Sequence, residues 1–213
     1  MSGTFPSTQG LRGLDFTNNQ PNLVSVSVSG RRQAKSQGAQ FFSFTVQTPP
    51  MTTAEHKKLM GFLASQQGQF EAFQIQLPNL STPAGSVLSN TLVVNGAHTA
   101  GDKTITVDGG TASATGYLKA GDMVRFIDTT TTVNGVAKAM NVKTYMVTAD
   151  LDTDGTGAGT LNIEPGIIDG VDNNSTMETN GVQFTVFMTN TTQEYSSGIA
   201  DFTQLEFEAR EAF

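Results

Sequence analysis

The segment from residue 24 to residue 47, VSVSVSGRRQAKSQGAQFFSFTVQ, decides the expected fold class. Valine alternates with serine over 24–29, and aromatic or aliphatic residues alternate with polar ones over 42–47. Alternation with a period of two is typical of a strand that buries one face. We therefore expect two half-buried strands, joined by the polar, basic loop 31–38 into a long hairpin. The hairpin should end at Pro49, because proline cannot donate to a central ladder.

The segment after this hairpin predicts one helix, from about residue 52 to 66. Thr52 and Glu55 have the spacing of a capping box, in which each side chain satisfies a free backbone N–H. The apolar side chains that follow share one helical face: Leu59, Phe62 and Leu63. The segment 70–77 then resumes as a strand, so this part of the chain predicts a sheet with one helix packed on it.

Short strands at regular spacing follow a Pro- and Ser-rich linker at 78–89. The expected strands are Thr91–Asn95, Thr104–Asp108, Met123–Ile127, Thr144–Ala149 and Thr160–Glu164. Glycine-containing turns separate them, which is typical of a small barrel or sandwich. Alternation resumes near 182–186 and 205–209, so two more strands are expected close to the C-terminus.

These elements predict a mainly β fold with two domains. Residues 1–83 and 170–213 are expected to form one split β-sandwich or barrel domain, with the packed helix. Residues 84–169 are expected to form a small β-barrel domain inserted into it. At 213 residues, the chain is long enough to bury such cores without covalent staples.

The composition removes several classes of active site. The chain has no cysteine, which excludes disulfides, thiolate metal sites and thiol catalysis. Its two histidines, His56 and His98, are not in a metal-ligand spacing. Four glutamates offer carboxylates without the spacing of an acid–base pair: Glu71, Glu164, Glu206 and Glu208. We therefore expect no enzyme activity, no cofactor and no metal.

One acidic motif resembles a calcium-binding loop. Residues 150–155, DLDTDG, match the opening of a calcium loop, with three carboxylates at alternate positions before a glycine. The twelfth position of such a loop should be a glutamate, and here it is Leu161. The flanking segments are also expected to be strands, so a hairpin turn is favoured over a calcium site.

Charge is distributed unevenly along the chain, whose formal net charge is −7. The start is mildly basic and the end strongly acidic, which favours head-to-tail contacts if these ends pack together or against a neighbouring copy. The alternative is an acidic face that is simply solvated. The only basic cluster is Arg31, Arg32 and Lys35. It has three interpretations: a solvated loop, a phosphate contact, or an intersubunit ion pair with the acidic C-terminal segment.

Two stretches resemble structural proteins of tailed bacteriophages. Ser27 to Pro78 resembles the N-terminal part of tail proteins of the distal-tail (Dit-like) or baseplate-hub type, through its Gly-Arg hairpin, aromatic strand, Pro-Met-Thr helix start and Gly-Gln-Phe strand. Leu118 to Ile167, with LKAGDMVRF and YMVTADLDTDGTGAGTLNIEPGI, resembles a small β-module of phage virion proteins. The loop 129–143 is longer than that pattern.

The resemblance implies a structural virion protein, a ring subunit of the distal tail or baseplate. Copies would assemble as a homo-oligomer, expected to be a hexamer, around a channel through which genomic DNA passes without specific binding. The inserted module would dock other tail or baseplate proteins. Arg31, Arg32 and Lys35 would then lie at a subunit interface or face the channel.

The expected location is the virion, after assembly in the host cytoplasm. No signal peptide and no apolar run of membrane-spanning length is visible, so no membrane partner is expected. The alternative function is a carbohydrate- or receptor-binding module of a phage tail, carried by the inserted domain. Sugar sites use exposed aromatic rings, and that domain offers only three: Tyr117, Phe126 and Tyr145.

Overall fold

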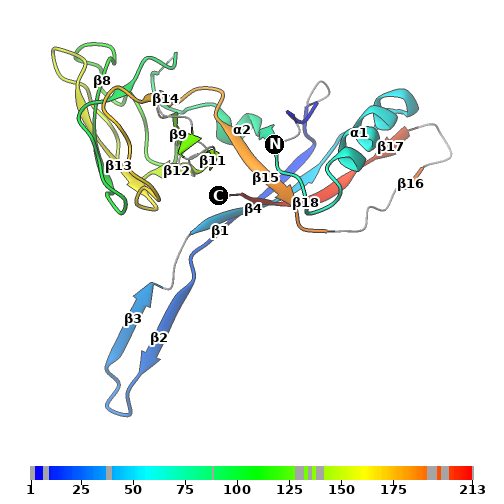
Figure 1. Ribbon diagram of the computed structural model, residues 1–213, viewed down its shortest axis with the longest axis horizontal. Helices are drawn as coiled ribbons and strands as arrows, with labels where there is room; N and C mark the ends of the chain where they lie inside the picture. Colours follow the sequence, from blue (N-terminus) through cyan, green and yellow to red (C-terminus); the bar gives the residue numbers. More distant parts are fainter. Residues whose placement is uncertain are drawn as a thin grey trace.

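The computed structural model describes residues 3–6, 10–36, 40–87, 89–127, 132–133, 136–137, 142–190, 196–197 and 202–212. It confirms the predicted mainly β fold. Figure 1 shows three parts: an open sheet with a helix against it, a closed barrel, and a two-stranded ribbon that projects away from both. Among the described residues, no helix has the length and apolar character needed to cross a membrane.

The open sheet is built from both ends of the chain. Its five antiparallel strands lie in the order β1 (Gly13–Asn19), β4 (Phe41–Gln47), β18 (Glu206–Glu211), β15 (Gln183–Met188) and β6 (Phe73–Gln76). The alternating segments predicted at 42–47, 70–77, 182–186 and 205–209 are confirmed as strands of this sheet. In β4, β6 and β18 buried side chains alternate with exposed or half-buried ones, while β15 buries three residues in a row, so one face of the sheet belongs to a core.

Helix α1 (Thr53–Ser65) packs on that buried face and confirms the predicted helix. The Glu55 carboxylate accepts hydrogen bonds from the Thr52 backbone N–H at 3.0 Å and from Thr52 Oγ1 at 2.9 Å. Leu59 and Leu63 are buried in the sheet core, and Phe62 packs against it. The short strands β16 (Ser196–Ser197), β17 (Phe202–Gln204) and β5 (Met51–Thr52) form a three-stranded sheet, in which β5 and β17 contact α1. A second, short helix is α2 (Pro78–Ser81).

The barrel closes with six strands in the order β12 (Thr144–Val147), β13 (Gly159–Glu164), β8 (Thr104–Asp108), β7 (Val93–Val94), β14 (Thr176–Glu178) and β9 (Met123–Ile127). The five strands expected between residues 91 and 164 are all present. The sixth, β14, lies beyond residue 169 and pairs with both β7 and β9. The barrel therefore extends past the end that the sequence pattern suggested.

The described residues contain two hydrophobic clusters, one in each body. The sheet cluster includes Phe42, Phe184 and Phe207, and the barrel cluster includes Phe126 and Tyr145. Met123 of β9 belongs to the sheet cluster, so the barrel wall also packs against the sheet. The two bodies thus share a packed boundary.

The predicted 24–47 hairpin is wrong in its pairing. Strand β4 pairs with β1, while β2 (Asn22–Val26) pairs with β3 (Arg32–Ser36) beyond the edge of the sheet. The segment 31–38, expected to be a loop, therefore contains a strand. The valines expected to be half-buried are exposed, with Val26 at 63%. The alternation identified a strand correctly, but no described part of the chain covers its apolar face.

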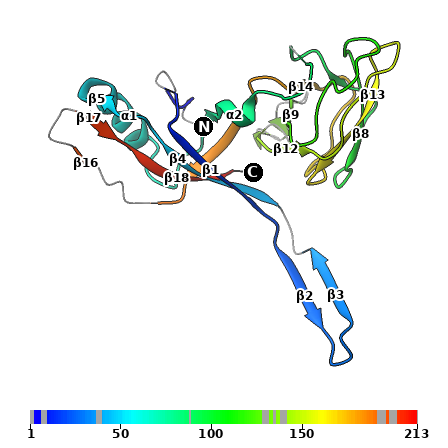
Figure 2. The same ribbon diagram turned by 180° about the vertical axis from the view of Figure 1, so that it is seen from behind.

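We call residues 22–36 the arm. Its two strands meet in a turn in which the Ser27 N–H donates to the Arg31 carbonyl at 3.0 Å, and Gly30 has a φ of 80°, in the left-handed region that favours glycine. The views in Figures 1 and 2 agree that the arm continues the β1–β4 pair and points away from the sheet, the helix and the barrel.

Candidate interaction surfaces

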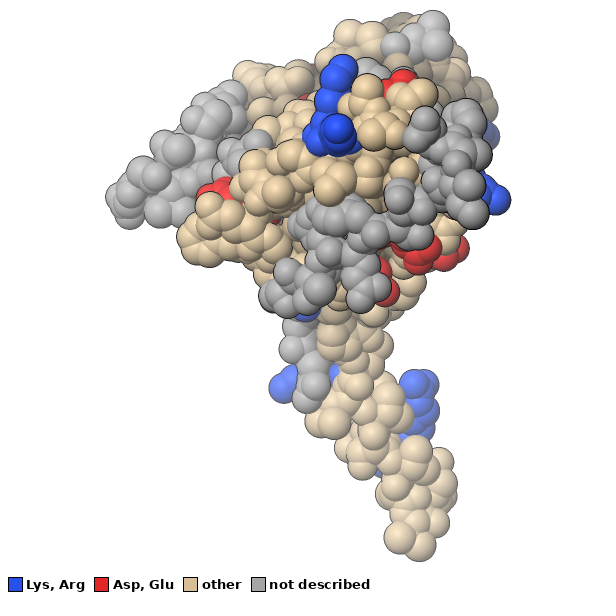
Figure 3. Space-filling view, turned by 90° about the vertical axis from the view of Figure 1, so that its right-hand side faces the viewer, with Lys and Arg blue, Asp and Glu red and all other residues tan. Residues whose placement is uncertain are grey.

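The arm holds the predicted basic cluster in an exposed position. Arg31 lies in the turn, and Arg32 and Lys35 lie on β3; all three side chains are exposed. The sequence has no acidic residue between Asp15 and Glu55, so the arm carries three positive charges and no negative one. Figure 3 shows blue side chains along the ribbon without red ones.

Apolar side chains accompany these charges. The exposed large hydrophobic residues in the described part of the chain are Leu23, Val24, Val26, Val28 and Phe70. All but Phe70 belong to the arm. A two-stranded ribbon is at best marginally stable by itself in water. An exposed ribbon that combines valines with arginines is therefore the main candidate for a contact with another molecule.

A second surface lies on the five-stranded sheet, opposite α1. We call it the outer face, and its side chains include Asp15, Thr17, Ser43, Thr45, Gln47, Glu206, Glu208 and Arg210. Residues that pair in register point to the same side of a sheet, and Asp15 and Glu208 both pair with Thr45. Asp15, Glu206 and Glu208 thus place three carboxylates on this face, on the two strands that flank β4. Arg210 stacks its guanidinium 3.7 Å from the Phe41 ring centroid.

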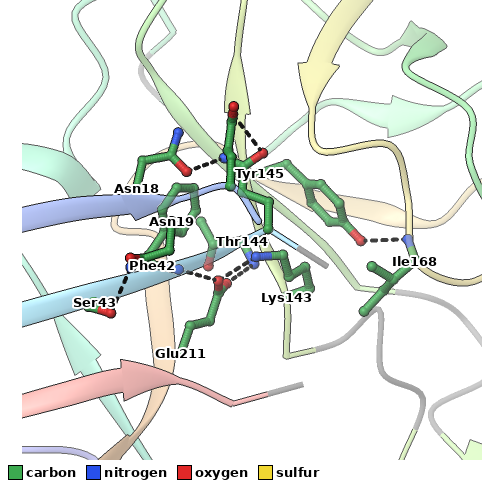
Figure 4. Close-up of polar contacts among 11 residues, drawn as sticks. Asn18, Asn19, Phe42, Ser43, Lys143, Thr144, Tyr145, Ile168 and Glu211 are labelled. Atoms are coloured by element: carbon green, nitrogen blue, oxygen red, sulfur yellow. Dashed lines mark hydrogen bonds and ion pairs between the residues drawn. The ribbon is translucent and has the colours of Figure 1, made fainter. Parts of the chain in front are cut away.

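The boundary between sheet and barrel is fixed by a buried charge network, drawn in Figure 4. Lys143, just before β12, forms an ion pair with Glu211 at the end of β18, and neither side chain is exposed. The Glu211 carboxylate also accepts hydrogen bonds from the backbone N–H of Thr144 at 2.8 Å and of Phe42 at 3.3 Å. The Lys143 ammonium lies 4.8 Å from the Phe42 ring centroid.

Burial controls the protonation of this network. Burial raises the pKa of Glu211, although the charge of Lys143 and the hydrogen-bond donors around the carboxylate act to lower it. Loss of water also lowers the pKa of Lys143, against the opposing pull of Glu211. Each charge is therefore tolerated only because the other is present.

Two further side chains form hydrogen bonds with the segments that connect the sheet and the barrel. The Asp122 carboxylate accepts hydrogen bonds from the N–H groups of Ala84 at 2.7 Å and Gly85 at 3.2 Å, where the chain enters the barrel. The Asn90 side-chain oxygen accepts bonds from the N–H groups of Thr179 and Asn180, both at 2.8 Å, where the chain leaves it. Polar contacts therefore fix the barrel where the chain enters it, where the chain leaves it, and where it packs on the sheet.

The acidic motif 150–155 forms part of the barrel's turns. Asp154 Oδ1 accepts bonds from the Thr156 N–H and hydroxyl at 2.8 and 2.7 Å, and these bonds lower the pKa of Asp154. Asp150 pairs with Lys119 at 2.9 Å, and the Asp152 carboxylate accepts a bond from the Gly116 N–H. In the part of the chain that the structure describes, no group of three or more His, Asp or Glu side chains is arranged to hold a metal ion.

The remaining sequence candidates are separated in space. His56 is buried on α1 against the sheet core, while His98 lies in a barrel turn, where its Nε2 is 3.0 Å from Thr106 Oγ1. Glu164 pairs with Lys103 at 2.8 Å on the barrel surface, away from the outer-face glutamates. The 129–143 loop contains the short pair β10 (Thr132–Val133) and β11 (Val136–Ala137), and residues 128–131, 134–135 and 138–141 lie outside the described residues.

Sequence reasoning missed the Lys143–Glu211 pair and the role of Asp15. Both depend on residues far apart in the chain. Pairing of β1 and β18 with β4 brings Asp15 near Glu208, and packing of the barrel against the sheet brings Lys143 to Glu211. The available signal for Glu211 was its place in the alternating run 205–211, where it takes a core-facing position. A comparison with protein families found no family model that matches this chain, and a comparison with curated proteins found no matching sequence.

Proposed function

We propose that this chain is a structural subunit of a ring in the distal tail or baseplate of a tailed phage. In this proposal copies assemble as a homo-oligomer, a hexamer by the sequence resemblance, around the channel through which genomic DNA passes. The barrel projects from the ring and docks other tail or baseplate proteins. The function is geometric, with no catalysis, cofactor or membrane contact, and its location is the virion.

The observation that carries the proposal is the arm. A ribbon with four exposed large hydrophobic side chains and three cations is suited to contact between proteins. The rigid attachment of the barrel also supports it, because a docking platform must hold its partners at a fixed angle. The network around Glu211 supplies that rigidity through contacts from β4, β12 and β18.

The test is the mass of the intact chain by light scattering, with negative-stain images of the same sample over a concentration series. Rings of about six copies would support the proposal, since closed cyclic symmetry is the common form of homo-oligomers. A protein that stays monomeric at every concentration, or a compact trimer without a channel, would contradict it.

The alternative, a carbohydrate- or receptor-binding module, is favoured by one feature. A groove of about 530 Å³ on the barrel is lined by Asn95, Thr106 and the carboxylate-bearing turn 150–154. The barrel's aromatic rings at Tyr117, Phe126 and Tyr145 are buried, so the described barrel offers no exposed ring for sugar stacking. Binding of the intact chain to a glycan array would favour this alternative.

A further inference from the structure

The arm has an apolar face that no described part of its own chain covers. Register places Val24 opposite Ala34 and Val26 opposite Arg32, so these side chains share one side of the ribbon. Alternation of this kind is typical of strands that bury one face. Within the described residues the arm strands are exposed at every position. Its apolar side chains are therefore open to a contact with another molecule.

The outer face of the sheet has the complementary charge. It presents the carboxylates of Asp15, Glu206 and Glu208, while the arm carries Arg32 on the same side as Val24 and Val26, and Arg31 in its turn. Lys35, which pairs with Leu23, lies on the opposite side of the arm. Phe41 and Phe187 are half-buried at the same face and offer apolar surface beside these charges. Opposite charges arranged around apolar contacts are the usual pattern of a specific protein interface.

The dimensions of the two surfaces also agree. The arm strands have five residues each and span about 17 Å, while β4, in the middle of the outer face, has seven residues and spans about 24 Å. The arm fits on this face along its length. It does not reach the outer face of its own sheet, because it continues the β1–β4 pair outward (Figures 1 and 2).

We propose that the arm of one copy lies on the outer face of the five-stranded sheet of a second copy, with Arg31 and Arg32 meeting Glu206 and Glu208. This inference rests on the proposed ring function and names its subunit contact. Because each copy carries both an arm and an outer face, the contact is head-to-tail and repeats until the ring closes.

The experiment compares the self-association of three double variants of the intact chain by sedimentation velocity. R31E/R32E reverses the arm, and E206K/E208K reverses the outer face. K57E/K58E reverses an adjacent, exposed pair on α1 and is the matched control. All six positions are exposed, so the changes leave both hydrophobic cores intact.

Either interface reversal places like charges in contact and should weaken association at least about a hundredfold, while the control assembles like the wild type. Mixing the two reversed variants should restore assembly. The acidic arm of one then meets the basic face of the other, and the basic arm meets the acidic face. A general loss of folding would not produce assembly that is absent from each variant by itself and present in their mixture.

Each other outcome has a defined meaning. Wild-type rings that persist in both reversed variants would overturn the arm–face contact and leave the ring function standing. Open chains or dimers that are lost in each reversed variant and restored in the mixture would support the contact and overturn the ring. A wild type that is monomeric at every concentration would overturn both, and retention of a duplex DNA fragment through Arg31 and Arg32 by that monomer would assign the arm to nucleic acid.

Discussion

Lys143 and Glu211 form an ion pair, with neither side chain exposed, where the barrel meets the five-stranded sheet. A single carboxylate there joins backbone N–H groups of β4 and of the start of β12. A buried ion pair contributes little net stability compared with apolar residues of the same shape, but it penalises every arrangement in which the two charges separate. Its main effect is to fix the orientation of the barrel.

Removing one partner of this pair should be costly. Glu211→Gln leaves the Lys143 ammonium buried without a countercharge, and we expect a loss of about 3–5 kcal/mol in the free energy of unfolding. The double variant K143M/E211L removes both charges and should recover part of that loss, because the backbone N–H groups of Thr144 and Phe42 still lose their carboxylate acceptor. Urea denaturation of the three proteins tests this. A Glu211→Gln variant as stable as the wild type would show that the pair is not buried.

The pH dependence of Lys143→Met follows from the raised pKa of Glu211. Burial raises that pKa above its ordinary value of 4.5, and loss of the ammonium raises it further. A group whose pKa is raised by folding contributes stability at low pH, which is lost as the pH rises through the folded-state pKa. The deficit of this variant relative to the wild type should therefore be larger at about pH 8 than at about pH 5. Lys103→Met, in the surface pair with Glu164, is the control and should show no such trend.

Gly85 should tolerate no side chain. A Cβ atom there would lie 2.3 Å from the Tyr117 carbonyl oxygen, where the chain enters the barrel. Gly85→Ala should therefore destabilise the protein by about 1–3 kcal/mol. Gly61→Ala is the matched control, because Gly61 is exposed on α1 with open space around its Cα, and the change should stabilise by about 0.5–1 kcal/mol. Thermal unfolding measures both, and equal effects of the same sign would refute the packing argument.

Amide exchange in the arm should report assembly. The arm's strands have no further strand on either side among the described residues, so their N–H groups should exchange fast in dilute protein. The same groups should become protected at concentrations where the chain assembles, while the barrel strands β8 and β13 stay protected throughout. Arm protection that does not change between these conditions would mean that the arm takes no part in assembly.

The local sequence pattern predicted strands and the helix start correctly where the surface that covers them lies in the same chain. The alternation near Phe44 and Phe207, the capping residues Thr52 and Glu55, and the strands of the barrel were all predictable, because period and capping are local properties. The alternation from Val24 to Val28 is as regular. It predicted burial that the described part of the chain does not provide, since a period of two indicates that a strand has an apolar face and does not indicate what covers that face.

The candidate surfaces were less predictable than the strands. Arg31, Arg32 and Lys35 were visible as a cluster because they are close in sequence. Their position on a projecting ribbon was not visible, because it depends on β2 pairing with β3. Asp15 and Glu208 lie on either side of Thr45 because two distant segments, β1 and β18, both pair with β4. The register of these pairings cannot be predicted from residue spacing alone.

The most direct test of the arm–face contact uses the absence of cysteine from the chain. The variant R32C/E208C carries one thiol on the arm and one on the outer face, and a flexible bis-maleimide joins those that come close. We expect a ladder of covalent oligomers on a denaturing gel, because each joined pair links two copies head to tail. The variant K57C/E208C, with one thiol on α1, should give no such ladder. Cross-linking of R32C/E208C that stops at single chains, or equal ladders from both variants, would contradict the account.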